Sequence, residues 1–425
     1  MNLLAGADEL PRALLALEDG TTLCGRCCGA EGEAFGEIVF NTSMTGYQEV
    51  VSDPSYAGQI VAFTYPQIGN YGVTPADDQA LGGAGPALRG VVVHDMCFSP
   101  SNWRSVGSLP DYLREHGVVA IQGVDTRALT LHIRERGALK AAISTVDLDL
   151  RSLVARVRAS EPISAHNFVA DVSTRKPVDL PAAAACSAGQ GRPRVAVIDC
   201  GEKRGIAERL VAAGCDATVL PWDTPAADVL AGGYDGAFLS NGPGDPRSVP
   251  ATMACAIELL GKLSVFGICL GNQMLTLAAG GSVEKLPYGH HGGNEPVMNL
   301  LTGKVEISAQ NHNYGTVFSS LGPLDPELSD GVGKHATDLR FWSKRRVAPV
   351  VRNERFGRIR LTHVNLNDGT PEGIQFLDVP AFSLQYHPEA RPGPHDAGYA
   401  FASFVRMIKG DPDYLAVDVC EGRAR

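Results

Sequence analysis

The stretch LSVFGICLGNQMLTLAAGG, residues 263–281, decides the fold of the second half of the chain. Its apolar beginning predicts a buried strand, and residues 271–279 predict a helix that ends at the two following glycines. Between strand and helix stands Cys269, with Gly267 and Gly271 two positions away on either side. This spacing is typical of a nucleophile elbow, a sharp turn that presents one reactive side chain because its neighbouring glycines have no Cβ.

Strand and helix patterns alternate on the N-terminal side of this stretch. Strands are predicted at residues 194–198, 217–220 and 234–239, and helices at residues 204–213 and 251–260. Such alternation favours an α/β fold with a parallel sheet and helices on both faces. Ligands bind such sheets beyond the carboxyl ends of the strands, so we expect the chemistry in the loops after Leu239 and Ile268.

A histidine and a carboxylate that suit a cysteine nucleophile follow a predicted strand at residues 381–384. They are His387 and Glu389, in the run QYHPE. A cysteine nucleophile needs a histidine base, and the base needs an orienting carboxylate. Taken singly, Cys269 also fits an inert buried cysteine and His387 a structural histidine, but the combination favours catalysis. The loop SNGPGDP, residues 240–246, adds glycines that turn backbone N–H groups toward an oxyanion.

The chain divides at residues 171–193, which are rich in Pro, Ala, Gly and Ser and predict an interdomain linker. Residues 1–170 predict a smaller mixed α and β domain, residues 194–412 the parallel-sheet domain, and residues 413–425 a C-terminal tail. The first domain has predicted strands at residues 36–40, 59–63 and 90–93, and predicted helices at residues 111–116 and 126–136.

Composition excludes several classes of protein. The 425 residues carry a formal net charge of −10, which does not favour attraction of the whole molecule to nucleic acid or anionic lipid. No stretch suggests a membrane span, and the first residues do not resemble a secretory signal. Ten cysteines at irregular spacings are too sparse for a disulfide scaffold, so we expect a cytoplasmic location.

Two short motifs invite a metal-binding interpretation, and we expect neither to bind a metal. Cys24, Cys27 and Cys28 have no second Cys pair or His cluster at zinc spacing. The run HHGG, residues 290–293, is explained more simply as a turn. A phosphate-binding loop of the form GxxxxGK[ST] is missing as well, so ATP chemistry is not expected in this chain.

Three motifs together resemble the class I, triad-type glutamine amidotransferases: GICLGNQ (267–273), SNGPGDP (240–246) and HPEARPGPHD (387–396). This resemblance covers residues 194–410. Residues 37–72 (EIVFNTSMTGYQEVVSDPSYAGQIVAFTYPQIGNYG) resemble the small-subunit family of carbamoyl phosphate synthetase, as do VDTR (124–127) and HHGGN (290–294). The second resemblance narrows the first, because other amidotransferases lack this N-terminal domain.

The resemblance implies the roles of individual residues. Cys269 attacks the side-chain amide of glutamine to form a thioester, His387 is the general base and acid, and Glu389 orients it. Backbone N–H groups of Leu270 and Gly244 form the oxyanion hole. The positions that match the family's glutamine contacts are Ser43, Gly242, Gly244, Leu270, Gln273, Asn311, Asn313 and Tyr314.

The resemblance also implies a partner and a pathway. The chain would form a heterodimer with a large ATP-binding and nucleotide-binding subunit, to which it supplies ammonia. That subunit, with ATP and Mg, would make carbamoyl phosphate from bicarbonate for arginine and pyrimidine synthesis, and the small chain would need no cofactor. Two alternatives remain: an amidotransferase serving another synthase, and a catalytically silent partner that only binds and regulates.

Four features depart from the family pattern. Asn272 stands where histidine is common, Tyr314 where phenylalanine or tyrosine occurs, and Asn313 where glycine is expected, so Asn313 would keep a glycine-like backbone with positive φ. These changes concern glutamine affinity rather than the type of reaction. An apparent insertion at about residues 316–358, rich in arginine from residue 340 onward, suggests either a solvated surface excursion or a docking site for an acidic surface or a nucleotide.

Overall fold

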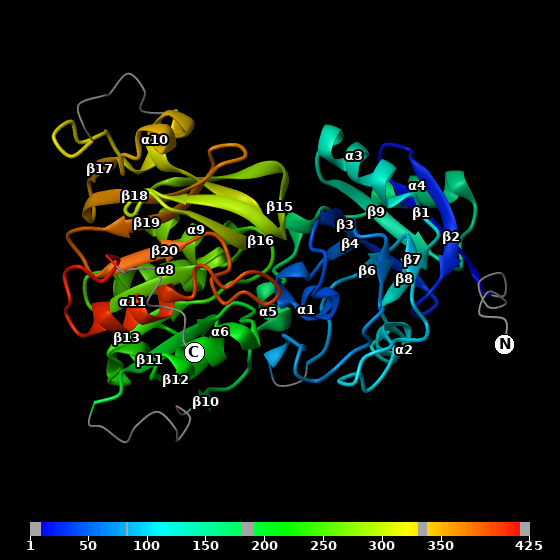
Figure 1. Ribbon diagram of the computed structural model, residues 1–425, viewed down its shortest axis with the longest axis horizontal. Helices are drawn as coiled ribbons and strands as arrows, with labels where there is room; N and C mark the ends of the chain where they lie inside the picture. The colour runs from blue at the N-terminus through cyan, green and yellow to red at the C-terminus, as the bar shows by residue number, and fades with distance from the viewer. Residues whose placement is uncertain (1–9, 82–83, 181–190, 330–337, 417–425) are drawn as a thin grey trace. The chain divides into compact units, whose positions relative to one another are not determined.

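The computed structural model describes residues 10–81, 84–180, 191–329 and 338–416 (Figure 1). Contacts divide the chain into two compact units, Met1–Phe168 with Pro287–Gly292, and Val169–Leu286 with Gly293–Arg425. Residues 181–190 of the expected linker, 330–337 of the expected insertion and 417–425 of the expected tail lie outside the described residues. Among the residues that are described, no helix has the length and apolar character needed to cross a membrane.

The first unit is built on a closed barrel with the strand order β1-β2-β8-β6-β4-β3-β9. Its strands are β1 (Arg12–Leu17), β2 (Thr22–Cys27), β3 (Glu33–Asn41), β4 (Gln59–Phe63), β6 (Gly90–Val92), β8 (Val119–Gln122) and β9 (Leu139–Ser144). The unit also contains α1 (Tyr47–Ser52), α2 (Leu109–Glu115), α3 (Thr126–Arg136), α4 (Leu150–Ala159), η1 (Pro54–Tyr56), η3 (Ile163–Ala165) and the pair β5 (Gln67–Ile68) and β7 (Asp95–Met96). The sequence predicted a mixed α and β domain but not the closure of the barrel.

Side chains on both faces of β4 and of the second half of β3 are buried. Neighbouring residues Ile38 and Val39 of β3 belong to two different apolar clusters, as do Ile60 and Val61 of β4. Successive side chains of a strand point to opposite faces, so continuous apolar runs fill the barrel interior and the layer outside it at the same time.

The second unit contains an eleven-stranded mixed sheet with the order β10-β12-β11-β13-β14-β20-β19-β18-β15-β16, in which β17 pairs with β18. Its strands are β10 (Val178–Leu180), β11 (Arg194–Asp199), β12 (Asp216–Pro221), β13 (Gly236–Leu239), β14 (Ser264–Ile268), β15 (Ser282–Asn299), β16 (Val305–Val317), β17 (Val350–Asn353), β18 (Gly357–Asn365), β19 (Pro371–Phe376) and β20 (Ala381–Leu384). Strands β12, β11, β13, β14 and β20 run parallel, whereas β10, β17, β18 and β19 pair antiparallel. The predicted parallel sheet is therefore the centre of a larger mixed one.

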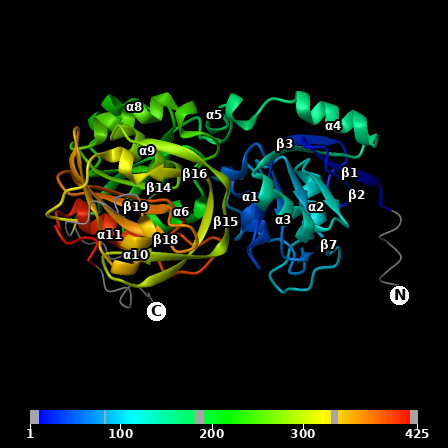
Figure 2. The same cartoon turned by 90° about the horizontal axis from the view of Figure 1, so that it is seen from above.

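Helices cover both faces of the parallel strands (Figure 2). They are α5 (Val169–Val172), α6 (Arg204–Ala212), α7 (Ala226–Ala231), α8 (Pro250–Leu259), α9 (Leu270–Ala278), α10 (Leu339–Arg345) and α11 (Tyr399–Ile408), with η4 (Pro246–Ser248) and η5 (Phe318–Leu321). Helices α8 and α9 pack together on one face, and α11 lies on the other. On the α11 side, Phe266 stacks on Phe382 with ring centroids 4.2 Å apart, and Phe404 packs against Phe266 at 5.6 Å. Large apolar side chains thus cover this face of β14 and β20.

Candidate active site

Four neighbouring parallel strands deliver the candidate site residues to one edge of the sheet. Strand β11 leads to Lys203, β13 leads to the loop at residues 240–246, β14 leads to Cys269, and β20 leads to His387. Ile268 is paired with Leu384, and the backbone N–H of Cys269 donates to the Leu384 carbonyl at 2.8 Å. The loops therefore meet because the carboxyl ends of parallel strands lie at the same edge.

Cys269 is the N-cap residue of α9 and adopts a backbone conformation that L-residues rarely use, with φ 55° and ψ −104°. Such a conformation costs about 1–3 kcal/mol and persists only where the surroundings impose it. The thiol is almost fully buried and donates to the Asn311 carbonyl at 3.4 Å. The positive φ is the structural signature of the nucleophile elbow that the sequence predicted.

The two glycines flanking Cys269 are required by close backbone approach. A Cβ on Gly267 would lie 2.7 Å from the backbone of Gly271, and a Cβ on Gly271 would lie 2.2 Å from the Leu239 carbonyl oxygen. Both distances are well inside van der Waals contact. The turn can therefore form only where these positions lack a side chain.

His387 is held from two directions. Its backbone N–H donates to the Ala309 carbonyl at 2.8 Å, and its Nδ1 lies 2.8 Å from Oε1 of Glu389. Burial lowers the pKa of His387, but the Glu389 carboxylate and the neighbouring Cys269 side chain outweigh that effect and raise it to about 10. Glu389 occupies Nδ1, whereas Nε2 has no hydrogen-bond partner among the described residues, so Nε2 is the nitrogen that can take a proton from the Cys269 thiol. The three residues thus form a Cys–His–Glu chain.

Lys203 is a member of the site that sequence reasoning missed. Its side chain is 3% exposed, and its Nζ donates to Oε1 of Glu389 at 2.7 Å and also to the Arg391 carbonyl. Burial raises the pKa of Glu389, but the charges of His387 and Lys203 outweigh it and hold that pKa well below its usual range. The available signal was position: Lys203 follows β11 at the same sheet edge as the other candidates.

Most of the predicted glutamine contacts lie around this triad in the second unit. Gln273 donates from Nε2 to the Tyr314 carbonyl at 3.0 Å, and Asn311 bonds Cys269 as described. Gly242 packs so closely that a Cβ there would lie 2.2 Å from the Cys200 carbonyl oxygen. At Gly244, with φ +83°, no described atom lies within 4 Å of a Cβ position, so space is open beside this backbone. Leu270 is the first residue of α9, where N–H groups lack helical acceptors.

Ser43 belongs to the first unit, and its surroundings are described within that unit. It is 8% exposed, and its backbone N–H donates to Oδ1 of Asn41 at 2.8 Å. Asn41 in turn donates to the hydroxyl of Tyr56 at 2.9 Å. The Ser43 hydroxyl itself has no hydrogen-bond partner among the described residues. Neighbouring hydrogen bonds therefore fix the backbone of Ser43 and leave its hydroxyl available for a ligand.

The expectation of a positive φ at Asn313 is wrong. Asn313 lies within β16 in extended backbone, and among the described residues the non-glycine positions with positive φ are Cys269, Arg346 and Ala390. An extended strand admits any side chain, so no glycine-like conformation is needed. Asn272 is buried, where its Nδ2 donates to Thr316 and Gln385 and its Oδ1 accepts from Ser383, so it acts as an internal tie.

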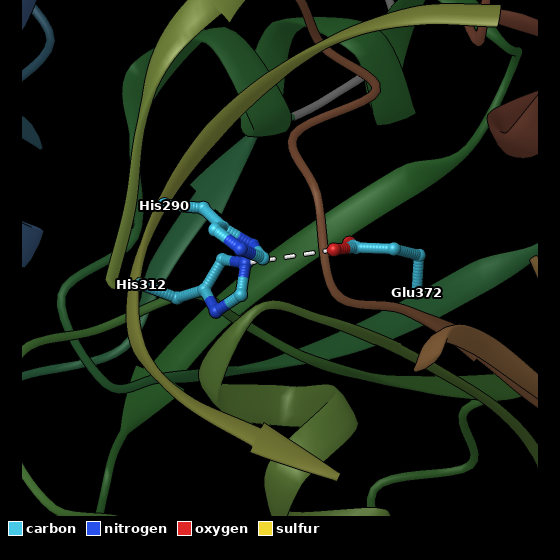
Figure 3. A group of neighbouring side chains, drawn as sticks. All are labelled: His290, His312 and Glu372. Atoms are coloured by element: carbon cyan, nitrogen blue, oxygen red, sulfur yellow. Dashed lines mark ion pairs between the residues drawn. The ribbon is translucent and has the colours of Figure 1, made fainter. Parts of the chain in front are cut away.

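The turn expected at residues 290–293 is also wrong, since β15 runs straight through them. Gly292 and Gly293 permit a turn but do not impose one. Within the second unit, His312 has Nδ1 2.8 Å from the Tyr314 carbonyl and Nε2 3.1 Å from Oε1 of Gln310. Its Nε2 lies 3.9 Å from Oε1 of Glu372 (Figure 3). A metal ion bound to Nε2 of His312 would displace the contact of that nitrogen with Gln310.

The cysteine motif of the first unit, Cys24, Cys27 and Cys28, has the features of ordinary packing residues. Cys27 is buried and its thiol contacts the Ala30 carbonyl at 3.4 Å, while Cys24 is exposed. Burial raises the pKa of the Cys28 thiol. Metal ions bind the thiolate form, so this burial works against ligation.

Comparison with known proteins decides the family. A sequence model of the carbamoyl-phosphate synthase small chain, CPSase domain, matches residues 15–143, and a model of glutamine amidotransferase class-I matches residues 196–323 and 345–407. The carbamoyl phosphate synthase small chain of Syntrophotalea carbinolica is 45% identical over 405 residues, covering 94% of this chain and 98% of that protein. The namesake from Thermotoga maritima is 46% identical over 403 residues, with coverages of 94% and 98%. This chain belongs to the carbamoyl-phosphate synthase small-chain family.

As a member of this family, the chain is a glutamine-hydrolysing subunit. Its amidotransferase domain lies in the second half of the chain. The amidotransferase model leaves residues 324–344 unmatched, and these lie within the expected insertion at about residues 316–358.

In the described part of the expected insertion at about residues 316–358, charged side chains such as Lys344 and Arg345 are exposed, while apolar side chains pack onto the second unit. Trp342 of α10 is fully buried, and β17 pairs with β18. Arg352 binds Asp325 at 2.8 Å. The apolar face of α10 anchors the segment, an effect that its charge run concealed.

A buried carboxyl beside the triad of this small chain carries a stability prediction. Glu202 is 1% exposed, and neither carboxyl oxygen has a hydrogen-bond partner among the described residues. Burial, and then the charges of Asp199 and Glu389, raise its pKa well above 4.5. A folded-state pKa above the unfolded value gives stability that is present below pH 4.5 and lost as pH rises.

We therefore expect Glu202→Gln to stabilise the chain at pH 8 by about 1–3 kcal/mol, because no carboxyl must then stay protonated. Urea unfolding of both proteins at pH 4.5 and pH 8 measures the effect. The gain should shrink at pH 4.5, and an equal gain at the two pH values would contradict the prediction.

Proposed function

We propose that this small chain hydrolyses L-glutamine to glutamate and ammonia through Cys269. The sulfur attacks the side-chain amide carbon, the C–N bond breaks, and ammonia leaves with a proton from His387, giving a γ-glutamyl thioester. Water then gives a proton to His387 and attacks the thioester, which releases glutamate and restores the thiol. The observation that carries this proposal is the strained Cys269 turn beside His387, whose Nδ1 binds Glu389 at 2.8 Å.

The raised pKa of His387 makes it a strong acceptor for the thiol proton, and the protonated ring then serves the leaving nitrogen. Glu389 orients the ring and stabilises its positive charge. The N–H groups of Leu270 and Gly244 would bind the oxyanion, helped by the partial positive charge at the N-terminus of α9. The remaining glutamine contacts would come from Ser43, Gly242, Gln273, Asn311, Asn313 and Tyr314.

The partner we propose is the large subunit of carbamoyl phosphate synthetase. The word "small" in the relatives' names implies a larger chain, and free ammonia becomes ammonium at neutral pH, which motivates enclosed transfer. The large chain would bind ATP and Mg and form carbamoyl phosphate from bicarbonate for arginine and pyrimidine synthesis, while this chain would hold no cofactor. The cysteines of the described residues are free thiols, which supports the proposal that this chain works in a reducing cytoplasm.

Affinity purification of this chain from its native extract tests the proposal. Mass spectrometry identifies what co-purifies, and the eluate is assayed for carbamoyl phosphate made from glutamine, bicarbonate and ATP. We expect a large ATP-binding chain and glutamine-dependent synthesis. Recovery of a different synthase would overturn the partner and spare the Cys269 mechanism, whereas no glutamate release from any eluate would indicate a silent homologue.

A further inference from the structure

A second buried carboxylate of the amidotransferase unit, Glu306 of β16, has no part in the mechanism above. It is 1% exposed. Its Oε1 accepts hydrogen bonds from Nδ2 of Asn299 and the hydroxyl of Tyr399, both at 3.0 Å. Its Oε2 accepts from the hydroxyl of Tyr386 at 3.1 Å. A carboxyl group is buried at this depth only where several donors compensate its lost hydration, so the arrangement is specific.

One of those three donors immediately precedes the candidate catalytic base. Tyr386 is fully buried, and the next residue is His387. The backbone N–H of His387 donates to the carbonyl of Ala309, which lies on β16, three residues after Glu306. The segment that carries the base is therefore bound to β16 twice, by a backbone bond at His387 and by a side-chain bond at Tyr386.

These bonds matter because the ladder of β20 ends before the base. Strand β20 stops at Leu384, so its pairing with β14 and β19 does not reach His387. The same strand β16 also accepts the hydrogen bond of Cys269, at the Asn311 carbonyl. Strand β16 thus holds both the nucleophile Cys269 and the base His387 by hydrogen bonds. The Glu306–Tyr386 bond holds only the segment that carries His387.

We propose that Glu306 is a positioning residue for His387, acting through the hydroxyl of Tyr386. This inference rests on the catalytic role of His387 proposed above. Small displacements of a catalytic group cost large factors in rate, since the reacting atoms must be aligned to within fractions of an ångström. Loss of the Glu306–Tyr386 bond frees the ring of Tyr386 to shift, and the adjacent imidazole shifts with it.

Two tyrosine variants separate positioning from general stability. Tyr386→Phe and Tyr399→Phe each remove one hydroxyl donor from Glu306, and Tyr399→Phe removes further bonds, since its hydroxyl also contacts Asn299 at 2.9 Å and His363 at 3.1 Å. In the complex with the large chain, we expect Tyr386→Phe to lower kcat for glutamine hydrolysis about tenfold with KM within about twofold. Tyr399→Phe should stay within about twofold of the unmodified protein in both constants.

Two substitutions of Glu306 test the carboxylate itself: a conservative one that keeps its hydrogen bonds and one that removes them. Glu306→Gln keeps an oxygen for Asn299 and Tyr399 and offers an amide to the Tyr386 hydroxyl, so kcat should fall no more than about threefold. Glu306→Leu keeps none of these bonds, and kcat should fall about 10- to 100-fold. If Glu306→Leu does not fold, the two tyrosine variants decide the question alone.

Equal losses in Tyr386→Phe and Tyr399→Phe, or losses that follow Tm, would overturn the inference. The parent complex and a Cys269→Ala complex accompany every measurement. If the parent hydrolyses glutamine, Cys269→Ala does not, and Tyr386→Phe matches the parent, then the positioning role fails while the proposed function stands. If Cys269→Ala retains hydrolysis, the proposed function itself fails.

Discussion

Replacement of Cys269 by alanine is expected to abolish glutamine hydrolysis, with a loss of roughly 10³-fold or more, because the proposed thioester forms on the Cys269 sulfur. Ammonium-dependent synthesis of carbamoyl phosphate by the complex with the large chain should be unchanged, since added ammonia bypasses this step. Glutamate release and carbamoyl phosphate formation from glutamine or ammonium measure the two activities.

Cys255→Ala is the matched control for this experiment. Cys255 is another buried free thiol of the same unit, 2% exposed, on α8. Its removal should leave both activities intact. Glutamine hydrolysis that persists in Cys269→Ala would show that the reaction does not depend on the Cys269 sulfur. Hydrolysis that disappears in both variants would show that the loss is not specific to that sulfur.

The second large effect concerns the buried pair of Lys203 and Glu389. Removing one partner of a buried ion pair leaves an uncompensated charge and costs about 3–5 kcal/mol. We therefore expect Glu389→Leu, which leaves the Lys203 ammonium without its carboxylate, to lower the free energy of unfolding by that amount, and Lys203→Met, which leaves Glu389 paired with His387, to lower it by less. The double variant should recover most of this loss, because no unpaired charge remains. Urea unfolding of the four proteins gives the coupling energy directly.

Activity should not recover with stability in that cycle. Without Glu389, the imidazole of His387 loses its orienting acceptor, and comparable losses in triad enzymes are about 10²- to 10⁴-fold in kcat. The stable double variant should therefore remain almost inactive with glutamine. A double variant that regains glutamine hydrolysis would show that Glu389 has no part in catalysis.

The raised pKa of His387 makes the free energy of unfolding depend on pH in the alkaline range. Against the effect of burial, Glu389 and Cys269 raise the pKa of His387 to about 10, whereas an unfolded histidine has a pKa of about 6.5. A raised folded-state pKa gives stability that is fully present below pH 6.5 and lost as pH rises toward 10. The free energy of unfolding of the parent should fall more steeply from pH 7 to pH 10 than that of the Lys203→Met/Glu389→Leu variant.

Local sequence patterns predicted the elements that carry the chemistry. The strand at residues 381–384 coincides with β20, and the helix at 271–279 is α9 within one residue. Gly267 and Gly271 predicted the turn at Cys269, because glycine at both positions permits the close backbone approach that the turn requires. Periodicity and glycine placement are local properties, so they are readable without the fold.

Other features arise only when distant segments meet. Lys203 is a buried partner of Glu389, 186 positions away, and its sequence context showed only an ordinary charged residue. The closed barrel depends on the pairing of β1 with β9, and the burial of Trp342 in α10 depends on a surface that other strands provide. Long-range pairing is not encoded in any single window of sequence.

The sequence by itself therefore determined the reactive residue types, Cys269, His387 and Glu389, and the strands that bring them to one edge of a sheet. The tertiary structure alone decided what surrounds them: the ammonium of Lys203 on Glu389, the extended backbone of Asn313, and the bond from Tyr386 to β16. The physical reason is the range of the interactions. Propensity and turn geometry act between near neighbours in the chain, whereas burial, ion pairing and the pKa of a buried group depend on residues that only folding brings together.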